Sequence, residues 1–129
     1  MGVRFKNMIR IQAAILLVLA VSLLIPLAVA LYYKESGAGL AFLFVSGGCA
    51  LIGGIIRLGI KSSDSKLKVR DGFFIVSAAW LTCSMVGALP FLLSGAISSP
   101  ADAFFESCSG FSTTGASILT NVEVLPKSV

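Results

Sequence analysis

The sequence predicts an all-α membrane protein with three transmembrane helices, followed by a re-entrant half-helix and a loop. Of its 129 residues, 57% are hydrophobic and only 12% are charged, whereas an ordinary soluble domain carries about 25% charged residues. The apolar residues form three long runs without any charge, at residues 11–33, 36–56 and 72–101. Because a membrane-spanning helix needs about 20 apolar residues, each run is long enough to cross a bilayer.

The first two runs predict a two-helix hairpin within residues 1–62. Only Lys34 and Glu35 separate the two runs, and their charges cancel. The first run also admits another interpretation, because its basic start and the Ala-Val-Ala sequence at residues 28–30 resemble a signal peptide with its cleavage site. Its apolar stretch is, however, longer than the usual signal-peptide core of about 7–15 residues.

Small residues recur along the second run, where Ser46, Ala50 and Gly54 stand four residues apart. This spacing predicts one helix face of small side chains. Since small residues let transmembrane helices approach closely, we expect that face to pack against other helices.

The third run is too long for one plain span, so a further element must begin near its end. Pro26 lies within the first run and Pro90 within the third, and each proline removes one backbone donor. Of the two, residues 87–90 are the stronger candidate for a bend, which would turn the chain toward a central axis. The alternative is that the helix simply tolerates Pro90.

Basic residues predict the orientation in the membrane. Arg4, Lys6 and Arg10 precede the first run, and five more stand within residues 57–70, which overlap a basic loop expected at 63–71. The positive-inside rule puts both groups in the cytoplasm. We therefore expect a multi-pass protein of the inner (plasma) membrane, with a cytoplasmic N-terminus. No basic face with interleaved aromatic residues stands outside the runs, which argues against nucleic-acid binding.

The reactive side chains do not predict an enzyme. The chain has no histidine, and its three cysteines, at positions 49, 83 and 108, are far apart. This pattern gives no zinc or haem site. Since no nucleophile stands with a base, we expect no catalytic residues.

A short helix is predicted from Pro100 to Gly110. Ser99 is a favourable N-cap, Pro100 suits the first helical position, and Asp102 complements the positive end of the helix dipole. Gly110 is a natural stop signal. A helix of this length is roughly 17 Å long and reaches only about halfway across a bilayer, as a re-entrant helix would.

The polar loop that follows, at residues 112–117, predicts a cation site of main-chain oxygens. A half-helix that ends inside the membrane aims its negative end there, and small residues let carbonyl groups crowd around one axis. An exposed outer loop would have a similar composition, so the pattern leaves both interpretations open. Asp102 and Glu106 share one helix face; they would either attract cations at the outer mouth or serve as a cap and a structural hydrogen-bond partner, and we favour the structural role.

Several stretches together resemble the TrkH/KtrB/HKT family of potassium transporters. They are residues 70–73, 87–91, 102–107 and, most strongly, 109–117 (Ser-Gly-Phe-Ser-Thr-Thr-Gly-Ala-Ser), while residues 125–127 look like the family's entry to its next helix. Such proteins hold four membrane–pore–membrane repeats around one ion path, and TrkH-like members have two extra helices before them. The resemblance implies that residues 72–129 are part of the first repeat: a helix, a pore half-helix, a filter loop and an outer linker.

The resemblance also implies an ion, its ligands and partners. The family's filter glycine falls on Gly115, and K⁺ would bind backbone carbonyls of Thr113, Thr114, Gly115 and Ala116. Asp102 and Glu106 would support the pore helix. The implied partners are the remaining repeats of the same transporter, a second copy of the full protein, and a cytoplasmic nucleotide-binding regulatory subunit of the TrkA or KtrA type.

Because the chain stops at Val129, before the second helix of the first repeat, we expect the N-terminal part of a potassium uptake protein that supplies one of four filter segments and is not competent alone. The alternative is a three-helix structural or accessory membrane subunit. In that case the Ser/Thr/Gly stretch would be an exposed outer loop.

Overall fold

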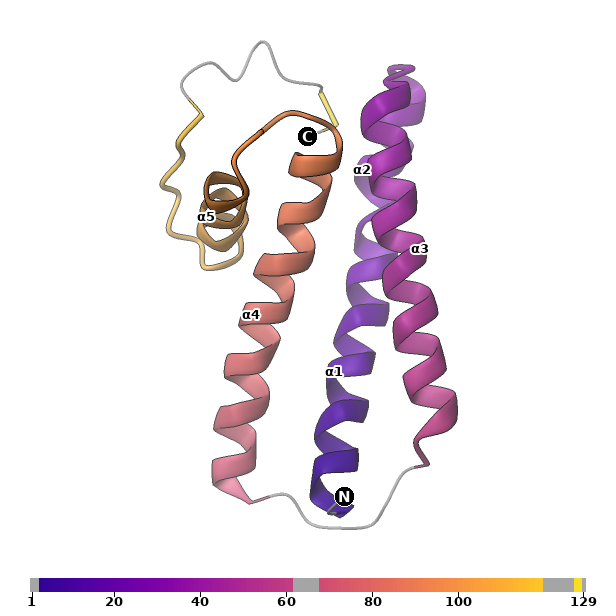
Figure 1. The fold of residues 1–129 in the computed structure, drawn as a ribbon, viewed down its shortest axis with the longest axis vertical. Helices are drawn as coiled ribbons and strands as arrows, with labels where there is room; N and C mark the ends of the chain where they lie inside the picture. The colour runs from indigo at the N-terminus through magenta and orange to yellow at the C-terminus, as the bar shows by residue number, and fades with distance from the viewer. Residues whose placement is uncertain (1–2, 62–67, 120–126, 129) are drawn as a thin grey trace.

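Helices dominate the computed structural model, which describes residues 3–61, 68–119 and 127–128 (Figure 1). In these ranges five helices follow one another: α1 (Val3–Ser22), α2 (Leu24–Tyr32), α3 (Ser36–Gly59), α4 (Val69–Leu93) and α5 (Pro100–Phe111). The same ranges contain no β-strand. The prediction of an all-α fold is therefore confirmed.

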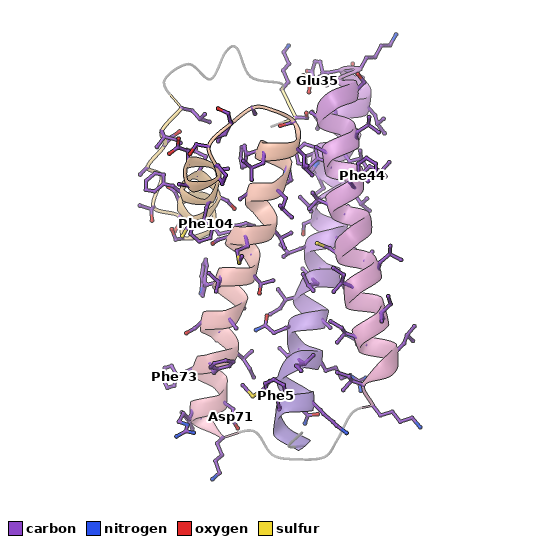
Figure 2. The ribbon with its side chains drawn as sticks, in the orientation of Figure 1. Phe5, Glu35, Phe44, Asp71, Phe73 and Phe104 are labelled. Carbon is purple, nitrogen blue, oxygen red and sulfur yellow. The ribbon has the colours of Figure 1, made fainter. Side chains whose placement is uncertain are left out.

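Three helical stretches are long and apolar enough to cross a membrane: Phe5–Tyr32, Ser36–Gly59 and Val69–Leu93. They correspond to the three predicted spans. Large apolar side chains cover their outer sides, as Phe44 and Phe73 show in Figure 2, with 71% and 73% of their surfaces exposed. Such exposure is costly in water but suits a surface that faces lipid.

The first span is interrupted at Leu23, between α1 and α2. Pro26 lies one turn later, and because proline has no N–H, the Ser22 carbonyl lacks its usual helical partner. By contrast, α4 continues through Pro90 and ends at Leu93. Near its prolines, the described chain thus interrupts its helix at Leu23 and not at residues 87–90, where less than one turn of α4 follows Pro90.

The contact between α3 and α1 lies at Gly53. A Cβ atom at Gly53 would stand 2.9 Å from the Ala13 carbonyl oxygen of α1, so only glycine permits this approach. Seven residues earlier, the buried Ser46 hydroxyl donates to the Ala20 carbonyl of α1 at 2.8 Å. Ser46 and Gly53 therefore mark one packed face of α3.

Of the predicted face of Ser46, Ala50 and Gly54, only Ser46 packs against another helix among the described residues. Ala50 is exposed, and a Cβ at Gly54 would meet no atom within 4 Å. The reason is helix geometry: at 3.6 residues per turn, seven residues return to within about 20° of the starting direction, whereas eight miss it by about 80°. A strict four-residue spacing therefore drifts away from the packed face.

The start of α1, the end of α3 and the start of α4 lie at one end of the bundle (Figure 1), and basic residues stand at each of these positions in the sequence. There the Arg10 guanidinium donates to the Ile60 carbonyl at 3.4 Å. In the first turn of α4, the Asp71 carboxylate accepts the N–H of the N-cap residue Lys68 at 2.9 Å. Glu35 lies at the opposite end (Figure 2). Residues 63–67 of the predicted basic loop and the Arg4 side chain lie outside the described residues.

Candidate functional site

The turn between α4 and α5 comes at Gly95. Its φ of 75° favours glycine, and the Gly95 N–H donates to the Leu92 carbonyl at 3.2 Å. The chain then enters α5, where the Ser99 hydroxyl accepts the Asp102 N–H at 3.4 Å and Pro100 takes the first helical position. The predicted start of the short helix is therefore confirmed.

A glycine of α4 lets α5 pack closely against it. A Cβ at Gly87 would overlap the Ser107 hydroxyl and would stand 2.6 Å from Cε2 of Phe111. Around this crossing a buried apolar cluster joins the two helices: Ala88, Ile97 and Ala103, with Phe104 packed against them (Figure 2). The absence of a side chain at Gly87 therefore fixes how close α5 lies to α4.

The C-terminal end of α5 has a threonine in the left-handed conformation. Thr113 has a φ of 55°, its N–H donates to the Gly110 carbonyl at 3.2 Å, and the Thr114 N–H donates to the Ser109 carbonyl at 3.0 Å. This is a Schellman cap. The expected stop at Gly110 is wrong, because α5 continues to Phe111 and the left-handed residue that ends it is Thr113.

Residues 112–119, which we call the return segment, run back along α5 toward the end of the molecule where α4 ends (Figure 1). The Ser109 hydroxyl of α5 donates to the Ala116 carbonyl at 2.5 Å. The Glu106 carboxylate of α5 accepts the Ile118 N–H through Oε2 at 3.1 Å. These two contacts hold the return segment, which has no regular secondary structure, against the helix.

All four predicted filter residues lie together in the return segment, and all four are exposed on this chain. Gly115 has a φ of 73°, which glycine adopts without strain. Among the hydrogen bonds between described residues, none reaches the carbonyls of Thr113, Thr114 or Gly115, whereas the Ala116 carbonyl is paired with Ser109. Within the described ranges, the segment therefore presents three consecutive main-chain carbonyls without a hydrogen-bond partner.

The two acidic residues of α5 have different surroundings. Asp102 is exposed in the first turn, where a negative charge complements the helix dipole. Glu106 lies one turn later, is half-buried, and accepts the Ile118 N–H. The contact of Glu106 is the structural hydrogen bond that the sequence analysis favoured for it.

Sequence reasoning missed Glu35, whose charge it set against that of Lys34. In the structure the Glu35 carboxylate binds Lys127 and Ser128, which are 92 and 93 residues away along the chain. No pattern of neighbouring residues in the sequence predicts such a contact. Residues 120–126, including part of the predicted entry to a next helix, lie outside the described ranges.

Comparison with known proteins decides which family this helical arrangement represents. No protein-family model matches the chain. The Trk system potassium uptake protein TrkH of Vibrio parahaemolyticus is 36% identical over 127 residues, which are 98% of this chain and 26% of that protein. TrkH of Escherichia coli is 37% identical over 129 residues, with coverage of 97% and 26%. The crystal structure of the potassium transporter TrkH from V. parahaemolyticus superposes with a TM-score of 0.87 at 37% identity, covering 96% of this chain and 26% of that one.

The chain is homologous to the N-terminal quarter of TrkH. The resemblance drawn from the sequence is therefore confirmed. The likeness to TrkH, together with the three apolar spans, identifies a membrane protein. The chain spans about a quarter of the length of the TrkH relatives that it matches.

Proposed function

We propose that this chain forms one selectivity-filter segment of a potassium uptake protein. The observation that carries the proposal is the row of three available carbonyls, at Thr113, Thr114 and Gly115, directly after the C-terminal end of α5. Carbonyl oxygens can replace the hydration shell of K⁺. The relatives named above are potassium uptake proteins, which favours K⁺ as the transported ion.

The electrostatics of α5 support the same proposal. The helix has 12 residues, so it is about 18 Å long and spans roughly half of a bilayer. Its C-terminal end carries a partial negative charge next to the three carbonyls. In the interior of a membrane protein, the helix end and the carbonyls attract a cation although no carboxylate is present. A carboxylate would bind the cation so tightly that it could not easily leave. We therefore infer that α5 is a re-entrant pore helix and that the Ala116 carbonyl contributes less than the other three.

The proposed orientation puts the basic end of the bundle in the cytoplasm and the α2–α3 hairpin outside. Basic residues stand at the beginnings of α1 and α4 and at the end of α3, as the positive-inside rule requires for an inner-membrane protein. K⁺ would then enter at the end where α4 finishes, and residues 72–129 would be part of one membrane–pore repeat that follows the hairpin of residues 1–62.

One filter segment supplies only part of an ion's ligands. The proposal therefore includes three further repeats of the same transporter, a second copy of the protein, and a cytoplasmic nucleotide-binding regulatory subunit. The support for these partners is the family resemblance and the quarter-length match to TrkH.

Replacement of the filter glycine tests the proposal. In the full-length protein, Gly115→Ser should change the selectivity for K⁺ over Na⁺ by about tenfold. The left-handed conformation costs a serine about 1–2 kcal/mol, so the backbone at residue 115 and its carbonyl must change direction. The measurement is K⁺ and Na⁺ uptake in cells that lack other potassium transporters. Gly95→Ser is the matched control, since Gly95 has a similar φ of 75° but lies outside the return segment. Unchanged selectivity in Gly115→Ser would contradict the filter assignment.

Cysteine labelling separates a filter segment from an exposed outer loop. The return segment is exposed on this chain, as both interpretations require, so the complete protein must decide between them. In a background without the native cysteines, a membrane-impermeant reagent should label Ser117→Cys slowly if the segment lines a narrow pore. Rapid labelling, equal to that of Ser36→Cys in the outer hairpin, would favour the accessory subunit instead.

A further inference from the structure

The carboxylate of Glu35 holds the chain that follows the return segment. Its Oε1 accepts the Lys127 N–H at 2.7 Å, and its Oε2 accepts the Ser128 N–H at 3.2 Å and the Ser128 hydroxyl at 2.5 Å. The Lys127 ammonium lies 4.7 Å from the ring centre of Tyr33, beside Glu35 in sequence. One short stretch of the hairpin therefore makes four contacts with two consecutive residues. We call this set of contacts the Glu35 clamp.

The backbone around Glu35 is itself fixed, so the clamp is anchored to the helical hairpin. Lys34 takes the left-handed conformation with a φ of 56° and ends α2. The Glu35 N–H donates to the Ala30 carbonyl of α2 at 2.9 Å, and the Glu35 carbonyl accepts the Gly39 N–H of α3 at 2.8 Å. Because Glu35 is bonded to both helices, its carboxylate can hold Lys127 and Ser128 in place relative to the hairpin.

A second carboxylate holds the outer end of the return segment. Glu106 of α5 accepts the Ile118 N–H at 3.1 Å, whereas Glu35, in the turn between α2 and α3, accepts the N–H groups of Lys127 and Ser128. The three available carbonyls of residues 113–115 lie in a segment without regular secondary structure. No helix or strand ladder sets their directions, and neighbouring carbonyl dipoles repel one another when no ion lies between them. The hydrogen bonds of the segment to Ser109 and Glu106, together with the Ser112–Thr114 contact within it, therefore help to fix these directions.

We propose that Glu35 is a positioning residue for ion selection, which ties the α2–α3 hairpin to the outer end of the filter-bearing chain through Lys127 and Ser128. This inference rests on the proposed function. It assigns the N-terminal hairpin a role in the filter: the end of α5 and Ser109 hold the inner part of the return segment, Glu106 holds its outer end at Ile118, and Glu35 holds Lys127 and Ser128. Charged acceptors form stronger hydrogen bonds than neutral ones, so a carboxylate suits this role better than an amide.

Glu35→Gln in the full chain tests the proposal with two readouts. The variant keeps the size of the side chain but loses the charge and one of the two acceptor oxygens. We expect amide hydrogen exchange at Lys127 and Ser128 to accelerate about threefold or more. We also expect the half-saturating K⁺ concentration for uptake to rise by a similar factor, while the amount of protein in the membrane stays unchanged. A loss of folding alone would instead lower the amount of protein and the maximal rate.

Two further variants complete the experiment. Ser128→Ala removes only the hydroxyl contact and should give a smaller change of the same kind. Ser36→Ala, at the adjacent exposed position whose hydroxyl makes no contact with the described residues, should match the wild type. Unchanged exchange in Glu35→Gln would overturn the clamp, and faster exchange with unchanged uptake kinetics would overturn its role in ion selection. If Gly115→Ser also leaves the selectivity for K⁺ over Na⁺ unchanged, the proposed function itself fails. If Gly115→Ser changes the selectivity but Glu35→Gln changes neither amide exchange nor uptake kinetics, only the inference about Glu35 fails.

Discussion

Two residues other than glycine in the described part of the chain take the left-handed conformation, Lys34 and Thr113, with φ angles of 56° and 55°. Each ends a helix with the same pair of main-chain hydrogen bonds. Each also stands at a segment for which we propose a function: Lys34 directly before Glu35, and Thr113 within the proposed filter. This conformation costs about 1–2 kcal/mol for a residue with a side chain. The strain lies where the backbone direction matters for the proposed site, as is common for functional segments.

The Glu35 carboxyl should make the stability of the protein sensitive to acid. The Ser128 hydroxyl, followed by the Lys127 and Ser128 amides, lowers the pKa of Glu35 below its ordinary value of 4.5. A lowered folded-state pKa means that the contribution to stability is complete above the unfolded-state pKa and is lost as the pH falls through the folded-state pKa. We expect the wild type to unfold at a higher temperature than Glu35→Gln in detergent at neutral pH. The difference should disappear below the lowered pKa.

A difference between these two proteins that stayed constant down to about pH 2 would contradict the acid dependence, because protonated Glu35 and glutamine are similar hydrogen-bonding groups. The Ser36→Ala variant serves as the control here too. Its unfolding temperature should follow that of the wild type across the same pH range.

At the scale of the elements, the contact between α4 and α5 makes a matched pair of substitutions informative. Gly87→Ala places a methyl group against the Ser107 hydroxyl and the Phe111 ring, so α5 must shift, at a cost of about 1–3 kcal/mol. We expect lower thermal stability and altered selectivity for K⁺ over Na⁺. Gly72→Ala lies in the same helix but meets no atom within 4 Å, so it should be neutral or stabilising by up to about 1 kcal/mol. Equal stability and selectivity in the two variants would show that α5 does not depend on the close approach at Gly87.

The elements themselves could be predicted largely from local composition. The three spans and the first residue of α5 follow from charge-free runs and from the Ser-Pro N-cap, because both signals act within a few residues. The packed face of α3 could not be predicted in this way. Gly53 and Gly54 are both small, and only the position of Ala13 on another helix distinguishes them. The end of α5 was misplaced for a similar reason: Gly110 fits a stop, but the last turn closes with hydrogen bonds to Thr113 and Thr114 instead.

For the whole molecule, the sequence indicates which residues form the proposed site but not what supports them. The four residues that we propose as filter residues come from one short sequence and lie together because they are consecutive. The hydrogen bonds from Ser109 to Ala116 and from Ile118 to Glu106 cross seven and 12 positions, and the Glu35 clamp crosses more than 90. Contacts over such separations depend on how the helices assemble, which no pattern within one segment reports.

The orientation of the whole bundle gives the last prediction. If the basic end is cytoplasmic, a membrane-impermeant thiol reagent added to sealed right-side-out vesicles should label Ser36→Cys, at the exposed outer hairpin, but not Lys61→Cys, at the exposed end of α3. After the vesicles are opened with mild detergent, both should react, which shows that the second site is accessible in itself. The native cysteines are replaced in both variants, so that every signal comes from the introduced thiol. Labelling of Lys61→Cys in sealed vesicles would reverse the orientation, because α5 and its carbonyls would then open toward the cytoplasm, and K⁺ could not reach the return segment from outside as the proposed uptake function requires.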